Sequence, residues 1–229
     1  MLRKLATHTS TLGRLPLLGK VGWLRSALGA VLGIGCSASA GWLMLGANGS
    51  ALPWLVAPIG ASAVLVFAVP ASPLAQPWPV IGGNLISAFI GFVMTHLFGP
   101  GITICALSVG LAIAAMSLAH CLHPPGGACA LLAPLGASAA MPGAFVLTLT
   151  INVLLLACVA WVYNHLTGHP WPHRLTDRSA TDPAAAQSTR SDLDAVLDEW
   201  DEVLDVDRDD LLILIRAVEQ RAIARNPAR

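Results

Sequence analysis

The feature that most constrains this chain is a block of 148 consecutive residues, 26–173, without a single Asp, Glu, Lys or Arg. A water-soluble fold needs charged groups on its surface, and soluble domains carry about 25% charged residues. In the hydrocarbon of a bilayer, each such charge costs about 2.5–3.5 kcal/mol on insertion scales. The block therefore predicts an integral membrane domain that is embedded in the lipid bilayer, which is its expected partner.

The charged residues all lie outside this block, and the part before it is purely basic. Five basic residues precede it, Arg3, Lys4, Arg14, Lys20 and Arg25, whereas the other eight Arg and all 13 acidic residues follow it. Since Lys and Arg mark cytoplasmic flanks, we expect a multi-pass protein of the inner membrane with both termini in the cytoplasm. No basic face exists for a nucleic acid. The expected regions are a cytoplasmic lead-in (1–25), a transmembrane domain (26–168), a linker (169–190) and a cytoplasmic amphipathic helical tail (191–229).

Apolar runs inside the block predict an all-α membrane bundle of four long transmembrane helices and two short, broken or re-entrant segments. The short runs are too short to cross about 30 Å of hydrocarbon as straight helices, and each begins at prolines. If they cross together with their flanks, the chain makes six passes in two inverted halves; if they are re-entrant, it makes four passes in two parallel halves. The expected long segments are 26–47, 80–98, 101–121 and 143–166, and the short ones are 57–69 and 124–140.

An internal repeat supports a two-fold arrangement. The stretch Ala57-Pro-Ile-Gly-Ala-Ser-Ala63 recurs as Ala133-Pro-Leu-Gly-Ala-Ser-Ala139, with six of seven positions identical at an offset of 76 residues. We interpret this as a duplication in which each unit contains a long helix, a short segment and a long helix. Broken segments at corresponding places in two halves are the best sequence indication of a transporter binding site. In the first long segment, Gly29 and Gly33 have a spacing that allows close helix packing.

The stretch that holds the most candidate chemistry is His120-Cys-Leu-His123-Pro124-Pro125-Gly126-Gly127. Ionisable residues within a membrane domain indicate function by default, and backbone amides at a helix start favour an anion. We expect a substrate site made by His123, Gly126, Gly127 and Ser138 from one half and by Gly60, Ser62 and Asn84 from the other. His120 and His123 are candidates for proton coupling.

Structural roles compete with these functional ones. His123 could simply cap a helix, Asn84 and Asn152 could hold helices together, and Ser62 and Ser138 could bond to their own helices. No metal site or cofactor is expected, since no further ligands accompany the two histidines. Without carboxylates in the membrane block, an enzymatic function is disfavoured.

The tail predicts two amphipathic helices. The first begins near Ser191, and the second begins near Asp207, with acidic residues in its first turn as the helix dipole favours. Such a pair would form a hairpin or a partner-binding element.

Several motifs in order resemble the HPP family of membrane proteins: the stretch 57–63, then Ser72-Pro-Leu-Ala-Gln-Pro77, Ile81-Gly-Gly-Asn84 and His123-Pro124-Pro125. The resemblance covers about residues 20–168. It implies a helical membrane domain, usually described with four transmembrane helices, and a role in nitrite transport for some members. Related proteins often carry CBS domains after the membrane part, which we expect this chain to lack.

These observations predict a transporter or channel for a small solute, and a small inorganic anion such as nitrite is the favoured one. The protein could also form a homo-oligomer. The alternative is a non-transporting membrane scaffold or sensor whose tail helices bind a cytoplasmic partner.

Overall fold

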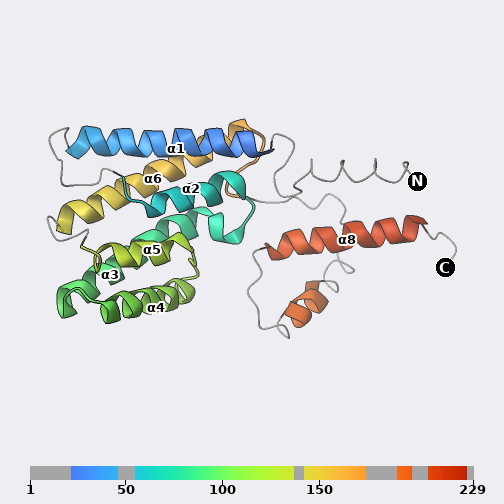
Figure 1. The fold of residues 1–229 in the computed structure, drawn as a ribbon. Coiled ribbons are helices and arrows are strands. Elements are labelled where there is room, and N and C mark those ends of the chain that lie inside the picture. Colours follow the sequence, from blue (N-terminus) through green and yellow to red (C-terminus); the bar gives the residue numbers. More distant parts are fainter. Residues whose placement is uncertain (1–21, 46–54, 137–141, 174–189, 198–205, 226–229) are drawn as a thin grey trace, which may run out of the picture.

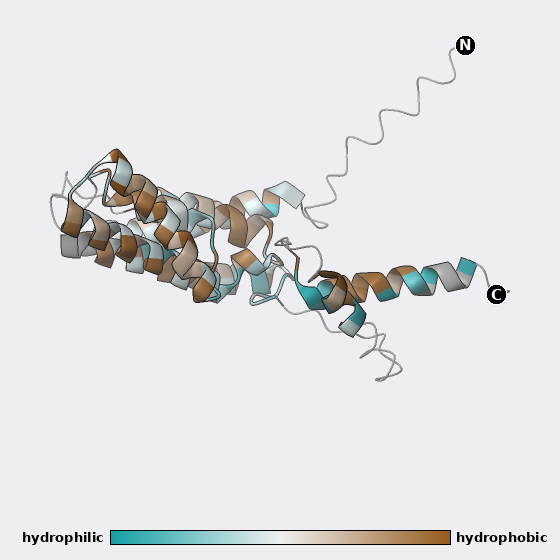
Figure 2. Cartoon of the chain, turned by 90° about the horizontal axis from the view of Figure 1, so that it is seen from below, coloured by the Kyte–Doolittle hydropathy of each residue, from teal (hydrophilic) through white to brown (hydrophobic). Residues whose placement is uncertain are grey.

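The structure, a computed structural model, describes residues 22–45, 55–136, 142–173, 190–197 and 206–225. All regular elements in these ranges are helical, which confirms the all-α prediction. A bundle of helices α1 to α6 forms one part, and the tail with α8 lies beyond one end of it (Figure 1). The bundle is apolar over most of its length, and hydrophilic residues gather in the tail and at the end of the bundle next to it (Figure 2).

The helices of the bundle follow the predicted segments closely. Two short helices, α2 (Pro58–Ala68) and α5 (Pro125–Leu132), begin at prolines, whose fixed φ suits the first helical position. A 3-10 turn (Pro73–Ala75) and a π-helical turn (Pro79–Gly83) lead into α3. The longer helices are α1 (Gly22–Leu45), α3 (Asn84–Phe98), α4 (Ile102–Leu118) and α6 (Pro142–Leu166).

Three helical stretches of the described chain are long and apolar enough to cross a membrane: Gly22–Leu43, Pro79–Phe98 and Phe145–Leu166. Helix α4 has 17 residues and is therefore about 25 Å long at 1.5 Å per residue, which is short for a straight crossing. Three of the four predicted long transmembrane helices are thus present by length and composition, and the fourth stays a prediction.

Helix α1 begins four residues before the predicted boundary and includes Arg25. The close packing predicted for Gly29 and Gly33 is confirmed. A Cβ on Gly29 would lie 2.5 Å from the Phe67 ring, and one on Gly33 would lie 2.7 Å from it. Because lipid provides no hydrophobic drive for helix association, this backbone approach supplies the packing of α1 against α2 and α6.

Successive helices α1 to α6 run in alternate directions between the two ends of the bundle (Figure 1). The hydrogen bonds agree with this. Tyr163 Oη donates to the Arg25 carbonyl at 2.7 Å, which joins the end of α6 to the start of α1. The start of α1 and the end of α6 therefore lie at the same end of the bundle. Alternation through the short helices is the arrangement expected of three passes per half.

The duplicated stretch has a different register in the structure. The copy at 57–63 begins α2, whereas Ala133 to Gly136 follow α5, and residues 137–139 lie outside the described residues. The two copies are therefore not in equivalent places. The helix starts instead align Pro58-Ile-Gly-Ala-Ser-Ala63 with Pro125-Gly-Gly-Ala-Cys-Ala130, 67 residues apart and identical at four of six positions. The two-fold repeat itself stays a prediction, and this register pairs Ser62 with Cys129.

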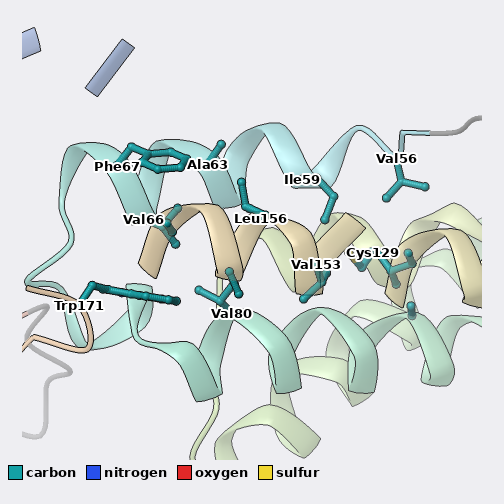
Figure 3. Close-up of a cluster of buried hydrophobic side chains, with 14 of the residues drawn as sticks. Val56, Ile59, Ala63, Val66, Phe67, Val80, Cys129, Val153, Leu156 and Trp171 are labelled. Carbon is teal, nitrogen blue, oxygen red and sulfur yellow. The ribbon is translucent and has the colours of Figure 1, made fainter. Parts of the chain in front are cut away.

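The core of the bundle lies around α2. Its side chains Ile59, Val66 and Phe67 are buried against Val153 and Leu156 of α6. Figure 3 shows these residues together with Val80 and the flat ring of Trp171, which closes one end of the cluster. This short helix thus has one face buried against longer helices, while Gly60, Ala61 and Val64 on its other face are exposed.

Both ends of α2 are fixed by polar side chains. The Asn152 side-chain oxygen accepts from the Val56 N–H at 3.1 Å. At the other end, Arg25 Nη1 donates to the Phe67 carbonyl at 2.8 Å, and Asn164 Nδ2 donates to the Val66 carbonyl at 2.9 Å. A helix end in a membrane needs such partners, since no water is available to its unpaired groups.

The tail forms helices where the sequence predicts them, over 190–197 and in α8 (Arg208–Arg225). Two ion pairs join these helices: Arg190 with Asp209 at 3.0 Å and Arg208 with Asp194 at 2.8 Å. These pairs are exposed, so each contributes little to stability.

Candidate functional site

Three predicted site residues meet in one buried hydrogen-bonded network. His123 Nε2 lies 2.9 Å from Ser62 Oγ, and Asn84 Nδ2 donates to the same Ser62 oxygen at 3.0 Å. All three side chains are fully buried. Residues from α2, α3 and the turn before α5 therefore converge at one point, as the sequence predicts.

The partners of His123 determine where its proton lies. Its Nδ1 lies 2.8 Å from the carbonyl oxygen of Leu74, which can only accept, so Nδ1 carries the hydrogen. Ser62 Oγ already accepts from Asn84, which leaves its own hydrogen to donate to Nε2. A neutral imidazole satisfies both bonds, in keeping with a site that contains no carboxylate.

Asn84 is the centre of the network. Besides Ser62, its Nδ2 donates to the Val80 carbonyl at 2.8 Å, and its Oδ1 accepts from Cys129 Sγ at 3.0 Å. Ser62 and Cys129, equivalent in the 67-residue register, thus hold the two ends of one amide group. The amide of Asn84 makes hydrogen bonds at both its nitrogen and its oxygen. It therefore holds neighbouring helices together, which is the structural role expected of an asparagine in a membrane helix.

Two glycines allow the elements of the network to approach each other. A Cβ on Gly83 would lie 2.5 Å from His123 Cβ, and one on Gly126 would lie 2.7 Å from Ser87 Oγ and 2.9 Å from the Gly83 carbonyl. Any larger residue at these two positions would push α5 away from α3. Gly126 therefore shapes the site through its missing side chain.

A cap formed by residues 70–76 and 171–173 covers the network at the end where the membrane domain begins and ends. Within it, Trp171 Nε1 donates to the Ala75 carbonyl at 2.8 Å, and the His173 N–H donates to Gln76 Oε1 at 2.9 Å. Gln76 Nε2 in turn donates to the Pro70 and Ser72 carbonyls. Because Leu74 of this cap binds His123, movement of the cap would change the network directly.

The backbone amides predicted to bind an anion are already engaged. Gly126 N–H donates to the His123 carbonyl at 2.8 Å, Gly127 N–H to the Pro124 carbonyl at 3.0 Å, and Gly60 N–H to the Ala57 carbonyl at 3.0 Å. Pro124 and Pro125 have no N–H to offer. An anion at these helix starts would have to compete with the bonds of the first turn.

The remaining predicted residues lie apart from the network. Gly60 is exposed, and a Cβ added to Gly60 or to Gly127 would meet no neighbouring element within 4 Å. His120 is exposed in a turn with φ of 52°. Ser138 lies outside the described residues. The structure thus brings together His123, Ser62, Asn84 and Gly126 of the predicted set.

Sequence reasoning missed two contributors. One is Cys129, whose place in the Pro-x-Gly-Ala-x-Ala pattern matches that of Ser62. Arg25 was assigned to the cytoplasmic lead-in, yet it is buried in α1 with 5% of its surface exposed. Its guanidinium binds the Phe67 carbonyl, Asn164 Oδ1 at 3.0 Å and His169 Nδ1 at 3.2 Å. The signal available was its place one helical turn before Gly29, on the same face of the helix.

Comparisons with known proteins agree with this organisation. Residues 17–172 match the transmembrane region of the HPP family. One transmembrane protein of Dictyostelium discoideum is 37% identical over 117 residues, which cover 48% of this chain and 41% of the relative. A second transmembrane protein of that organism is 40% identical over 88 residues, which cover 37% of this chain and 28% of the relative.

The matched region thus spans under half the length of each of these relatives. No solved structure matches the chain. The family match covers more than half of the chain and includes the whole helical bundle with its buried polar network. The chain belongs to the HPP transmembrane-region family.

Proposed function

We propose that this membrane protein is a transporter or channel for a small solute, and that the favoured solute is a small inorganic anion such as nitrite. The observation that carries the proposal is the buried network of His123, Ser62 and Asn84 where two short helices meet. Polar groups are costly inside a membrane protein. A cluster of them at broken helices is typical of the binding site of a transporter.

The chemistry of the network suits a neutral or anionic solute. It contains hydroxyl, amide and imidazole groups that can each donate a hydrogen bond, and no carboxylate that would repel an anion. In the described arrangement these donors bind one another, so the solute would replace bonds within the network. The start of α5 adds the favourable end of a helix dipole beside His123. The proposal includes no enzymatic step.

Proton coupling belongs to the same proposal and rests on His123. Its imidazole is bound on both nitrogens, so a proton gained at Nε2 would break the bond that Ser62 donates. Protonation and opening of the network would then be linked. His120 is exposed, so its part in the proposal is to pass protons to the surface.

The test is a flux assay with purified protein in liposomes. Entry of nitrite, nitrate, formate and chloride is measured by fluorescence or volume change, and empty liposomes give the background. We expect entry of at least one anion through the wild type and a loss of most of this entry in His123→Ala. The matched control is His96→Ala, since His96 is an exposed histidine of α3 and its removal should leave the flux unchanged.

Entry at the rate of empty liposomes for every anion, or equal rates in His123→Ala and the wild type, would contradict the proposal.

A second function is favoured by the tail. Asp210 of α8 lies 3.1 Å from His173 Nε2 at the cap, while Leu214 and Val218 of α8 are more than half exposed. This arrangement would suit a sensor whose tail binds a partner and acts on the membrane domain. Truncation after Arg174 separates the two functions, because transport should persist without the tail whereas sensing should not.

A further inference from the structure

Two serine hydroxyls inside the bundle have no hydrogen-bond partner among the described residues. They are Ser87 Oγ on α3 and Ser108 Oγ on α4, and both side chains are fully buried. An unpaired buried hydroxyl lowers stability, because it loses the hydrogen bonds that it made in water. Native proteins contain few such groups, so each calls for an explanation.

The usual solution for a hydroxyl in a membrane helix is visible elsewhere in the same bundle. Thr95, Ser117 and Thr150 each donate to the carbonyl four residues earlier, at 2.8, 2.9 and 2.8 Å. The same type of acceptor exists for Ser87 in the carbonyl of Gly83 and for Ser108 in that of Ile104. Neither serine makes this bond, so their hydroxyls point elsewhere.

Both hydroxyls lie along the line of contact where α3 packs against α4 and α5, here called the seam, which starts at the polar network. Ser87 follows Asn84 by one helical turn on the same face of α3, and Ser87 Oγ lies beside Gly126. On α4, the buried residues are Ser108, Ala112 and Met116, which share a face at four-residue spacing. Met116 lies close to both Gly83 and Gly126, so this face of α4 turns toward α3 and α5.

Ser108 extends the seam away from the network. It precedes Met116 by eight residues, or about 12 Å along the helix axis. It therefore lies toward the end of the bundle that is opposite to the cap. The residue of this face that lies between Ser108 and Met116 is the small, buried Ala112. A solute crossing between α3 and α4 would meet Asn84, Ser87 and Ser108 in turn.

We propose that Ser87 and Ser108 are additional solute-binding residues, and that the path of the small inorganic anion runs between α3 and α4. This inference rests on the proposed transport function. The hydroxyls donate hydrogen bonds to the passing anion and to the water that accompanies it, and this replaces the missing protein partners. The tight contact of Gly91 with the Ala130 backbone closes the part of the seam that lies between α3 and α5.

Cysteine labelling tests the path without requiring knowledge of the solute. Ser87→Cys and Ser108→Cys are treated in liposomes with a small, water-soluble methanethiosulfonate reagent, and labelling above that of the natural cysteines is measured by mass spectrometry. The matched controls are Ala88→Cys and Val80→Cys, which place a thiol at buried positions of the same region but off the path. We expect labelling at positions 87 and 108 and protection at 80 and 88.

A second measurement uses changes that hardly disturb packing. If the hydroxyls are dry, Ser87→Ala and Ser108→Ala should raise the melting temperature in detergent, because an unpaired polar group is removed. If they contact water and solute, the melting temperature should stay or fall, and anion entry should fall about two- to tenfold for the loss of one hydrogen bond.

Protection of both cysteines together with higher melting temperatures of both alanine variants would overturn the inference, even in a protein that carries anions. Labelling at positions 87 and 108 in a protein that shows no anion flux would support a water-filled path between α3 and α4. That result would overturn the proposed transport function instead.

Discussion

At the scale of single residues, the site depends on the completeness of its hydrogen bonds. Asn84 uses its amide nitrogen and oxygen on Ser62, Val80 and Cys129, and His123 uses both ring nitrogens. In a medium without water each of these partners is costly to remove. In the proposed transport function, the network would open only when a solute supplies equivalent hydrogen bonds.

Cys129 gives a prediction at this scale. In Cys129→Ala the Asn84 Oδ1 loses its donor, and we expect a loss of about 1–3 kcal/mol in stability, the cost of an unsatisfied buried acceptor. Cys129→Ser keeps a donor at the same place and should lose less. Thermal unfolding of both variants in the same detergent is the measurement, and equal stability of Cys129→Ala and the wild type would show that this bond is not formed.

At the scale of elements, α2 is the part whose position matters most. Its Ser62 faces the network, and its two ends are held by side chains of α1 and α6. Arg25 is central because a buried cation at the C-terminal end of α2 also complements the helix dipole. The bonds that it donates place α2, and thereby Ser62, relative to α6.

Substitution of Arg25 tests this role. Arg25→Leu removes donors to Phe67, Asn164 and His169, and we expect a loss of about 1.5–3 kcal/mol, the range for a hydrogen bond to a charged group. Arg25→Lys should recover only part of this lost stability, because the ammonium group of lysine lacks the planar set of donors that a guanidinium has. The control is Arg190→Ala, which removes only an exposed ion pair and should change the melting temperature little.

The cap over the network is the second element with a testable role. Trp171→Phe keeps a buried ring but loses the bond to the Ala75 carbonyl, so the 3-10 turn Pro73–Ala75 should open more often. Hydrogen exchange of residues 72–76 measured by mass spectrometry should become faster than in the wild type. Trp161→Phe, a change of an exposed tryptophan, serves as the control, and unchanged exchange in Trp171→Phe would show that the cap does not depend on this bond.

Much of the helical layout could be predicted, because charge exclusion and proline positions determine where membrane helices start and end. The starts of α2 and α5 at Pro58 and Pro125 are local features of this kind. The sequence could not settle the register of the repeat, because the matching seven-residue stretches are longer than the Pro-x-Gly-Ala-x-Ala pattern at the helix starts. Identity alone does not show which copy begins a helix.

The site could be predicted only in part, for a similar reason. His123, Ser62 and Asn84 stand out as polar residues in an apolar sequence. The Leu74 carbonyl, the partner of His123, is a backbone atom that every residue has, and it is selected by the course of the chain alone. The burial of Arg25 depends on the end of α2, which is 42 residues away, so no local pattern specifies it.

At the scale of the whole molecule, the start of α1 and the end of α6 lie at one end of the bundle, together with the tail (Figure 1). With the basic residues before α1, this predicts that both termini face the cytoplasm. Epitope tags at the two termini should therefore both resist protease added to intact cells and both be cleaved after permeabilisation. Cleavage of a single tag in intact cells would exclude an even number of passes.

In the proposed function, a small anion crosses the membrane through the network of His123, Ser62 and Asn84. The most direct measurement is the initial rate of nitrite entry into liposomes that contain equal amounts of wild type, Asn84→Ala or the milder Ser62→Ala, each checked for a monodisperse folded state. We expect entry through the wild type and a fall of about tenfold or more in Asn84→Ala, where several hydrogen bonds are lost together. Wild-type rates in both folded variants would contradict it.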